Sequence, residues 1–472
     1  MEVALAQTRV APLEPGGTLE AIVARIGEAE AMGCRLVVFP GRALVAPSEA
    51  DIERIAAASR GITAVLGAAS RHEPLAVAAD RVIVAHQGRP IESTGPAAAS
   101  FSIDATAFCA STGGPPVPAS CTGADWSIHL ATAPYRHLEA PSRREKAVAW
   151  TATHRAGLLF VNAVGDAGED VLDGGSFAVR ADGHLACHAP FAEAGLSVFD
   201  TDGSTIPWPE ASPMERLRDV LTLGLRRFVA STGLERVIVG LSGGIDSAVV
   251  ASLAARALGP DAVTAVFLPS RFTAAANRND ASEIARCLGT GFLEISIETL
   301  HQAARAALPE TPTGTVDENL QPRLRAVILM ALANLTNALV LCPGNRSEIA
   351  MGYNTLYGDT IGAVAPIADL YKEEVYALGR LLSEGIPASV FAKPPSAELR
   401  PGQRDDDDLP PYELLDPLLA EILDRGAKRE DLLALGHPAK RVDEVLSRMR
   451  VNAFKHRQLP PKIRVRAELA QG

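Results

Sequence analysis

Cysteine is scarce in this chain of 472 residues, and no two cysteines form a Cys-x-x-Cys pair. This pattern argues against a disulfide framework and against a zinc site built from thiolates. It is typical of a reducing compartment, so we expect a cytoplasmic protein. The six cysteines are Cys34, Cys109, Cys121, Cys187, Cys287 and Cys342.

The chain also lacks an excess of positive charge and an uninterrupted apolar segment. Lys and Arg number 45 against 56 Asp and Glu, which leaves a net charge of -11 and no visible basic patch for nucleic acid. The amino terminus reaches an acid before any base and has no secretory leader pattern. Residues 326–345 carry no charge, but Asn334, Asn337 and Pro343 interrupt them. We therefore expect a buried helix followed by a buried strand, and no membrane partner.

Apolar residues make up 47% of the chain, enough to fill the cores of the two to four domains that the length predicts. Residues 1–200 alternate short apolar runs with helical patterns, as in a layered α/β domain. Residues 201–213 are rich in Thr, Gly, Ser and Pro, which predicts a linker. Residues 214–472 then begin with a helix and continue with strand–helix alternation, which predicts a doubly wound parallel sheet.

One motif in the second half carries chemistry. After the predicted strand 236–240 comes Gly240-Leu241-Ser242-Gly243-Gly244-Ile245-Asp246-Ser247, and a helix-forming run follows at once. Glycines let backbone N–H groups converge, the helix start adds a positive dipole end, and two hydroxyls add donors. The motif therefore predicts an anion cradle, with Asp246 able to hold a Mg²⁺ ion that bridges phosphates. ATP is the expected ligand, against the weaker alternative of an ordinary capped turn.

The cradle is not a Walker A loop, because no lysine in the chain follows a glycine. Ser-Gly-Gly-x-Asp-Ser instead resembles the loop of N-type ATP pyrophosphatases, in the adenine nucleotide alpha hydrolase-like class. The resemblance implies cleavage of ATP between the α and β phosphates, with pyrophosphate in the loop.

Six further segments resemble the NAD⁺ synthetase family. They are LPSRFT (268–273), ENLQPRLR (318–325), GNRSE (344–348), GYNTLYGD (352–359), KPPSAELRPGQ (393–403) and KHRQLPP (455–461). The resemblance implies that deamido-NAD⁺ is adenylated by ATP and that ammonia then displaces AMP. It also implies a homo-oligomer.

The resemblance assigns site residues motif by motif. It implies that Asp246 and Glu348 hold magnesium and act in catalysis with Lys455. Residues 240–247 and Arg325 would bind ATP and pyrophosphate, and deamido-NAD⁺ would meet Asn319, Glu348, Asp359 and Lys455. Purely structural roles remain open: Arg323 and Arg325 could snorkel, Glu348 could pair with Arg346, and Lys455 could be a solvated helix-end charge.

Two positions depart from the family pattern, and one run is ambiguous. Pro343 stands where the family has a hydroxyl that touches ATP, and Arg346 replaces a lysine, so both put ATP affinity in question. The acidic run 405–408 would ordinarily be a solvated loop. In the family an acidic loop at this place closes over the active site, so the run is also a candidate lid with Gly402 as its hinge.

The first domain resembles the nitrilase-type glutaminase found in longer members of the family. Short matches lie at 36–40, 123–125, 133–134, 161–165 and 173–176, which imply an α-β-β-α sandwich. The Glu-Lys-Cys triad of that enzyme is not recognisable. Gly41 stands at the Glu position, and the first lysine of the chain is Lys146. Cys109 lies near the nucleophile position without a base, so we interpret it as a relic or core thiol.

We therefore expect an ammonia-using NAD⁺ synthetase with an inactive glutaminase-like domain that serves as a scaffold or receives ammonia from elsewhere. Three alternatives stay open. They are a glutamine-dependent enzyme with an unusual glutaminase site, a non-catalytic nucleotide-binding paralogue, and a nitrilase-type amidohydrolase with a nucleotide sensor.

Overall fold

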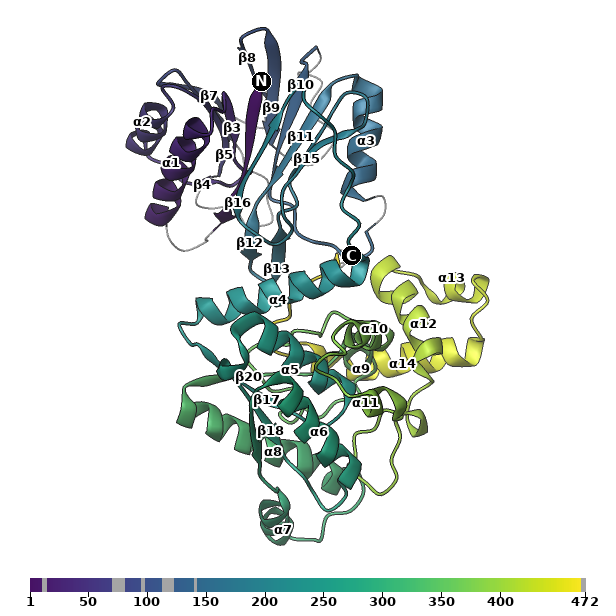
Figure 1. The fold of residues 1–472 in the computed structure, drawn as a ribbon. Coiled ribbons are helices and arrows are strands. Elements are labelled where there is room, and N and C mark those ends of the chain that lie inside the picture. Colours follow the sequence, from purple (N-terminus) through teal and green to yellow (C-terminus); the bar gives the residue numbers. More distant parts are fainter. Residues whose placement is uncertain (11–14, 70–80, 95–97, 113–122, 140–141, 468–472) are drawn as a thin grey trace. The chain divides into compact units, whose positions relative to one another are not determined.

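The computed structural model describes residues 1–10, 15–69, 81–94, 98–112, 123–139 and 142–467. Its chain divides into two compact units, Met1–Val220 and Leu221–Gly472, and each unit has its own sheets and cores (Figure 1). The division falls inside helix α4 (Pro213–Ser231). Residues 201–212 contain no helix or strand, and the linker at 201–213 stays a prediction.

The first unit contains two large β-sheets and a small one. The seven-stranded sheet has the order β16 (Gly195–Asp200), β1 (Glu2–Gln7), β3 (Leu36–Val38), β5 (Thr63–Ala69), β6 (Arg81–His86), β7 (Arg89–Thr94), with β4 (Leu44–Val45) beside β5. The six-stranded sheet has the order β15 (Leu185–His188), β14 (Phe177–Val179), β11 (Gly157–Asn162), β10 (Trp126–Ala131), β9 (Thr106–Thr112), β8 (Ala99–Ile103). The small sheet consists of β13 (Asp170–Asp173), β12 (Val164–Ala167) and β2 (Arg9–Val10).

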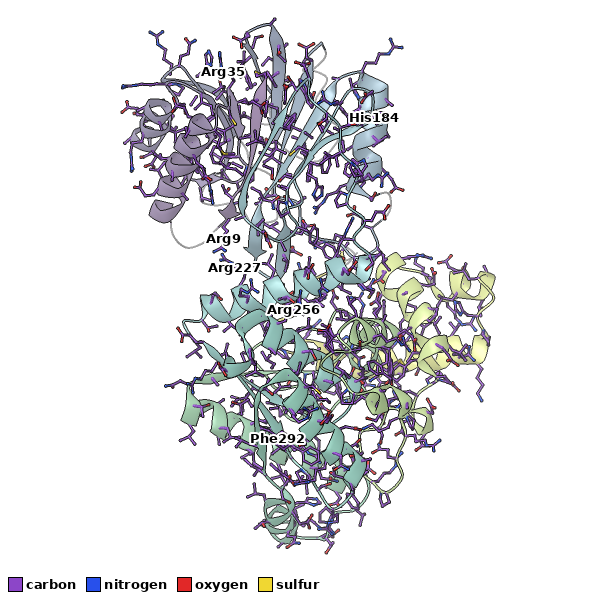
Figure 2. All side chains as sticks on the ribbon, in the orientation of Figure 1. Arg9, Arg35, His184, Arg227, Arg256 and Phe292 are labelled. Carbon is purple, nitrogen blue, oxygen red and sulfur yellow. The ribbon has the colours of Figure 1, made fainter. Side chains whose placement is uncertain are left out.

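Alternating apolar residues give both large sheets two buried faces. On β1, Val3 and Leu5 join the core between the sheets, whereas Ala4 and Ala6 join a second core on the outer face. Helices α1 (Pro15–Ala31) and α2 (Glu49–Ala58) cover that outer face, and α3 (Arg143–His154) covers the other sheet. Side chains fill these layers (Figure 2). The predicted α-β-β-α sandwich is confirmed.

The second unit is built on a parallel sheet in the order β19 (Gly291–Glu294), β18 (Val263–Phe267), β17 (Arg236–Gly240), β20 (Ala338–Leu341). This confirms the predicted parallel sheet. Its α-helices after α4 are α5 (Ile245–Leu258), α6 (Ala275–Leu288), α7 (Glu298–Ala306), α8 (Thr315–Thr336), α9 (Arg346–Met351), α10 (Lys372–Leu381), α11 (Ala388–Ala392), α12 (Tyr412–Arg425), α13 (Arg429–Ala434) and α14 (Ala439–His456). Short 3₁₀ turns lie at Pro260–Ala262 and Asp405–Asp407.

The uncharged stretch 326–345 spans the end of α8 and the whole of β20. Its strand is buried as expected, but Val327, Met330 and Leu335 on the helix are exposed. Among the described residues, no helix combines the length and hydropathy needed to cross a membrane.

Candidate functional site

The loop between β17 and α5 has a backbone that only glycine permits at its centre. Gly243 has a φ of +82°, and a Cβ atom there would lie 2.4 Å from the carbonyl oxygen of Asn277. A side chain at this position would be strained and would collide with backbone. Glycine at position 243 lets the chain turn sharply from the strand into the helix.

The start of α5 faces this loop without a side-chain cap. Gly244 is the N-cap residue and makes no side-chain hydrogen bond to the helix. The hydroxyls of Ser242 and Ser247 lie 3.1 Å apart, and the N–H of Gly244 donates to Oγ of Ser242 at 3.2 Å. Uncapped N–H groups and the helix dipole favour an anion at this point, with the two hydroxyls as further donors.

Two carboxylates meet at one buried ammonium group beside the loop. Nζ of Lys372, the first residue of α10, donates to Oδ2 of Asp246 at 2.6 Å and to Oε1 of Glu348 at 3.0 Å. Asn345 links the same groups, because its Nδ2 donates to Oδ1 of Asp246 at 2.9 Å and its Oδ1 accepts from the N–H of Glu348 at 3.0 Å. The starts of α5, α9 and α10 therefore converge.

The charges in this cluster depend on one another. Burial raises the pKa of Glu348 above its ordinary value, against the opposing effect of the Lys372 cation. Burial alone would lower the pKa of Lys372, but the carboxylates of Asp246 and Glu348 raise it well above its ordinary value. Lys372 is therefore a permanent cation, and its charge favours the ionised form of its partners.

A third carboxylate, Asp405, belongs to the same cluster. Asp405 is buried, and its Oδ2 accepts from the hydroxyl of Tyr412 at 2.9 Å. Oδ1 is buried with no hydrogen-bond partner among the described residues. The ring of Tyr412 also lies 5.3 Å from Nζ of Lys372. One member of the acidic run 405–408 is therefore part of the site rather than solvated surface.

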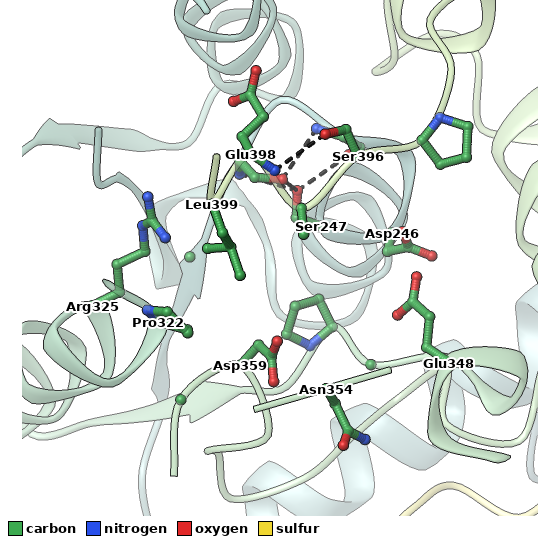
Figure 3. A pocket seen from close by; sticks show the side chains of 18 of the residues that line it. Asp246, Ser247, Pro322, Arg325, Glu348, Asn354, Asp359, Ser396, Glu398 and Leu399 are labelled. Atoms are coloured by element: carbon green, nitrogen blue, oxygen red, sulfur yellow. Dashed lines mark hydrogen bonds between the residues drawn. The ribbon is translucent and has the colours of Figure 1, made fainter. Parts of the chain in front are cut away.

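A cavity of about 620 Å³ in the second unit is lined by Asp246, Glu348, Lys372 and Asp405. Its wall includes the loop after β17, the end of β20 and residues 393–405. Figure 3 shows Asp246 and Glu348 pointing toward one another on one side, with Arg325 on the other. Nζ of Lys393 ties the segment to the loop by donating to the carbonyl of Gly243 at 3.0 Å. A volume of this size holds a nucleotide.

Two predicted residues, Arg325 and Asp359, line the cavity. Burial lowers the pKa of Arg325 to about 10, and its Nε donates to the carbonyl of Leu268 at 2.9 Å. Asp359 is open to solvent through the cavity, yet the protein atoms packed around it raise its pKa to about 6. Both charges face the space that a ligand would fill.

Two other predicted residues support a cavity loop. Asn319 accepts from the hydroxyl of Thr355 at 2.7 Å. Nζ of Lys455 donates to the carbonyls of Gly352 and Asn354 at 2.7 and 2.8 Å. Neither Asn319 nor Lys455 is among the residues that line the cavity. In this structure their hydrogen bonds stabilise the segment 352–359.

The two departures noted in the sequence differ in their consequences. Pro343 lines the cavity. Arg346 turns elsewhere, forming ion pairs with Asp369 and with Asp424 and stacking its guanidinium 5.3 Å from the ring centre of Tyr371. Arg346 therefore stabilises the packing of α9, and its pairing with Glu348, considered above, does not occur.

Two positions of the first unit bear on the glutaminase. Gly41 is packed so closely that a Cβ atom would lie 2.7 Å from the carbonyl oxygen of Leu130. Cys109 lies in the middle of β9 and is disulfide-bonded. Cys109 is buried as expected of a relic or core residue, but the expectation of a free thiol there is wrong, because its sulfur is in a disulfide. Cys121 lies outside the described residues.

A family model for NAD synthase matches residues 217–460, which is just over half of the chain. The chain belongs to the NAD synthase family. The matched region holds the loop, the carboxylate–lysine cluster and the cavity. It leaves out the first large unit almost entirely.

Curated relatives extend the similarity beyond the matched region. The glutamine-dependent NAD(+) synthetase of Rhodobacter capsulatus is 37% identical over 352 residues, 70% of this chain and 64% of that protein. The enzyme of the same name from Aquifex aeolicus is 35% identical over 393 residues, 73% of this chain and 69% of its own. The chain thus spans a little under two thirds of the Rhodobacter relative's length.

Solved structures support the fold of both units. A glutamine-dependent NAD+ synthetase from Acinetobacter baumannii, determined in complex with ADP, superposes with a TM-score of 0.74 at 24% identity and covers 99% of this chain and 96% of that one. The corresponding enzyme from Cytophaga hutchinsonii gives 0.79 at 16% identity, with 98% and 94% covered. These similarities show that both units share the fold of those two structures.

Sequence reasoning missed Lys372 and Asn345. A signal for Lys372 existed, because a lysine at the first position of a helix opposes the helix dipole and needs a compensating partner. Asn345 is a standard N-cap residue, and its second bond to Asp246 could not be inferred from its type. Within the described residues, no group of three or more His, Cys, Asp or Glu side chains is arranged to hold a metal ion.

Proposed function

We propose that this chain is an ATP-dependent NAD⁺ synthetase that amidates deamido-NAD⁺. One observation carries the proposal: the uncapped start of α5 and the Lys372 cluster face a single cavity large enough for a nucleotide. Membership of the NAD synthase family supports it. The relatives named above are synthetases of this kind.

The reaction has two balanced steps. A carboxylate oxygen of deamido-NAD⁺ attacks the α phosphorus of ATP, the bond to the bridging oxygen breaks, and pyrophosphate leaves. Ammonia then attacks the acyl carbon, AMP leaves with the electron pair of the broken C–O bond, and the extra proton passes to a base or to water. Neither step is easy without fixed donors for the oxygens that gain charge.

The chain's own residues suit the first step. The N–H groups of the loop and α5, with the hydroxyls of Ser242 and Ser247, are placed to hold the departing pyrophosphate. The cation of Lys372 adds attraction for the same anion, and Arg325 faces the cavity from the other side. A low-dielectric cavity makes each of these charges more effective than in water.

Asp246 and Glu348 fit a magnesium ion, because both present carboxylate oxygens on one side of the cavity, beside the positive charge of Lys372. Mg²⁺ is commonly held by one or two carboxylates together with substrate phosphates. A bound ion would supply neutralising charge to the phosphate oxygens. Its remaining ligands would come from nucleotide and water.

We propose further that ammonia does not come from glutamine in this chain. Glu cannot occupy position 41 without displacing the backbone at Leu130, and the first lysine is Lys146. A disulfide-bonded Cys109 has no thiolate to attack an amide. The first unit is then a scaffold. A homo-oligomer belongs to the same proposal.

A direct comparison of nitrogen sources tests the proposal. NAD⁺ formation and pyrophosphate release should be measured with deamido-NAD⁺, ATP and Mg²⁺, first with ammonium and then with glutamine. We expect turnover with ammonium and only background with glutamine, unchanged in Cys109→Ala. Efficient glutamine use that Cys109→Ala abolishes would overturn the ammonia-only reading.

Pro343 in the cavity wall favours a second candidate, a non-catalytic nucleotide-binding paralogue. Binding of ATP without any pyrophosphate release, with either nitrogen source, would support it. Turnover with ammonium would exclude it.

A further inference from the structure

Asp416 on α12 is a buried carboxylate that does not line the cavity. Its Oδ1 accepts from the hydroxyl of Ser347 at 2.5 Å, and its Oδ2 accepts from the N–H of Glu373 at 2.9 Å. Burial raises its pKa to about 6. A buried carboxylate is costly, so both of its oxygens are used on specific donors.

The two groups that Asp416 holds are the chain neighbours of Glu348 and Lys372. The hydroxyl of Ser347 also accepts from the N–H of Lys372 at 3.0 Å. A single carboxylate therefore joins the start of α9 to the start of α10. This junction lies where Glu348 and Lys372 extend toward Asp246.

The helix that carries Asp416 also contacts Lys372 directly, through Tyr412. Tyr412 lies four residues earlier on α12, so the two side chains share a face of the helix. The ring of Tyr412 lies 5.3 Å from Nζ of Lys372, and its hydroxyl donates to Asp405 at 2.9 Å. Helix α12 thus fixes both the backbone and the side chain of Lys372.

We propose that Asp416 is a positioning residue that holds the Lys372 ammonium group between Asp246 and Glu348, and so sets the affinity of the site for ATP. The role in catalysis rests on the proposed function, whereas the role in placing Lys372 does not. Without Asp416, the N–H of Glu373 and the hydroxyl of Ser347 lose their acceptor, and the two helix starts are free to separate.

A double-mutant cycle in the full chain tests the proposal through the Kd for ATP with Mg²⁺, measured by calorimetry. We expect Asp416→Ala and Lys372→Met each to weaken binding about tenfold, and the double variant to bind within about twofold of Lys372→Met, because the two changes remove the same interaction. Full additivity of the two losses would overturn the proposal.

Two variants separate positioning from general destabilisation. Asp416→Asn can still accept from the N–H of Glu373 and can donate to Oγ of Ser347, so we expect it to bind ATP within about threefold of wild type. Asp317→Ala is the matched control, because Asp317 also joins two helices, through His301 and Arg305, away from the cavity. We expect its effect to add to that of Lys372→Met. An Asp416→Asn protein as weak as Asp416→Ala would contradict the geometric role.

A structural readout keeps the inference separate from the proposed function. If wild type binds no ATP, the proposed function fails, and crystal structures of the Asp416→Ala and Asp317→Ala proteins then decide the positioning role. We expect Nζ of Lys372 to leave Asp246 and Glu348 only in the Asp416→Ala protein. An unmoved Lys372 there would overturn the proposal.

Discussion

Nζ of Lys372 lies 2.6 Å from Oδ2 of Asp246, although 126 positions separate the two residues in the sequence. Asp246 belongs to the glycine-rich loop that the sequence singles out, and Lys372 begins a helix far downstream. Their contact ties the anion-binding end of α5 to α10. Of the three charged groups that meet here, the loop motif contains only Asp246, because Lys372 and Glu348 come from other parts of the chain.

The first prediction concerns Asp246. Asp246→Asn keeps the size of the side chain but leaves Lys372 with one carboxylate and removes a candidate magnesium ligand. We expect kcat/KM for NAD⁺ formation to fall about 100-fold or more, with a weaker dependence on Mg²⁺. Steady-state assays across Mg²⁺ concentrations measure both.

Asp443→Asn is the control for that variant, because Asp443 pairs with Arg429 at the surface. We expect it to behave as wild type. Unchanged activity and Mg²⁺ dependence in Asp246→Asn would remove the metal-binding role of Asp246.

The second prediction uses two glycines with similar positive φ angles. Gly243 has a φ of +82° and the backbone of Asn277 against it, whereas Gly259 has a φ of +88° and nothing within 4 Å of the point where a Cβ would lie. Alanine strains both positions by about 1 kcal/mol. Only at Gly243 does it also push the loop out of shape. We therefore expect Gly243→Ala to abolish detectable ATP binding and Gly259→Ala to bind ATP normally with a slightly lower Tm.

The third prediction concerns the missing general base. Gly41→Glu restores the family residue but places its Cβ against the carbonyl of Leu130. We expect no glutamine hydrolysis and a loss of about 2 kcal/mol in the stability of the first unit. Gly27→Glu is the matched control, because Gly27 lies on α1 with open space around it. Gly41→Glu with glutaminase activity would show that the active site needs only this residue.

The fourth prediction concerns pH. Burial lowers the pKa of His129 from 6.5 to about 4. Between pH 6.5 and pH 4 the unfolded chain binds a proton at His129 that the folded chain does not bind. The contribution of neutral His129 to the free energy of unfolding is therefore complete above pH 6.5 and is lost as the pH drops toward 4. We expect His129 to account for about 3 kcal/mol of that loss.

Denaturant unfolding at pH 7 and pH 4.5 measures this effect. His129→Gln should reduce the pH dependence, and His188, whose pKa burial lowers in the same direction, should account for part of the remainder. An identical pH dependence in wild type and His129→Gln would contradict the assignment.

The sequence was most informative where local pattern and tertiary structure agree. The predicted strand 236–240 has the bounds that the structure gives to β17. Its central residues Val237, Ile238 and Val239 are buried, so a short continuous apolar run marks the strand. Strands β7, β8 and β12 are rich in polar or small residues, so no such run marks them in the sequence.

The charged part of the site was harder to predict than the loop. Glycines and hydroxyls at fixed spacing define the loop locally, whereas Lys372, Asp405 and Asp416 come together only when α10 and α12 pack against α9. The motif resemblance assigns Lys455 and Asn319 to the ligand, which stays a prediction, and in this structure Lys455 donates to backbone carbonyls while Asn319 accepts from Thr355. Residue type alone cannot distinguish a residue that contacts a ligand from a residue that positions it.

The products formed from ATP test the central claim most directly. ATP labelled in its α phosphate should be incubated with the protein, Mg²⁺, deamido-NAD⁺ and ammonium, and the nucleotides separated. The loop at Ser242 and the cluster at Lys372 predict labelled AMP and free pyrophosphate, each equal in amount to the NAD⁺ formed. Labelled ADP with free phosphate, or NAD⁺ absent while ATP stays intact, would contradict the account.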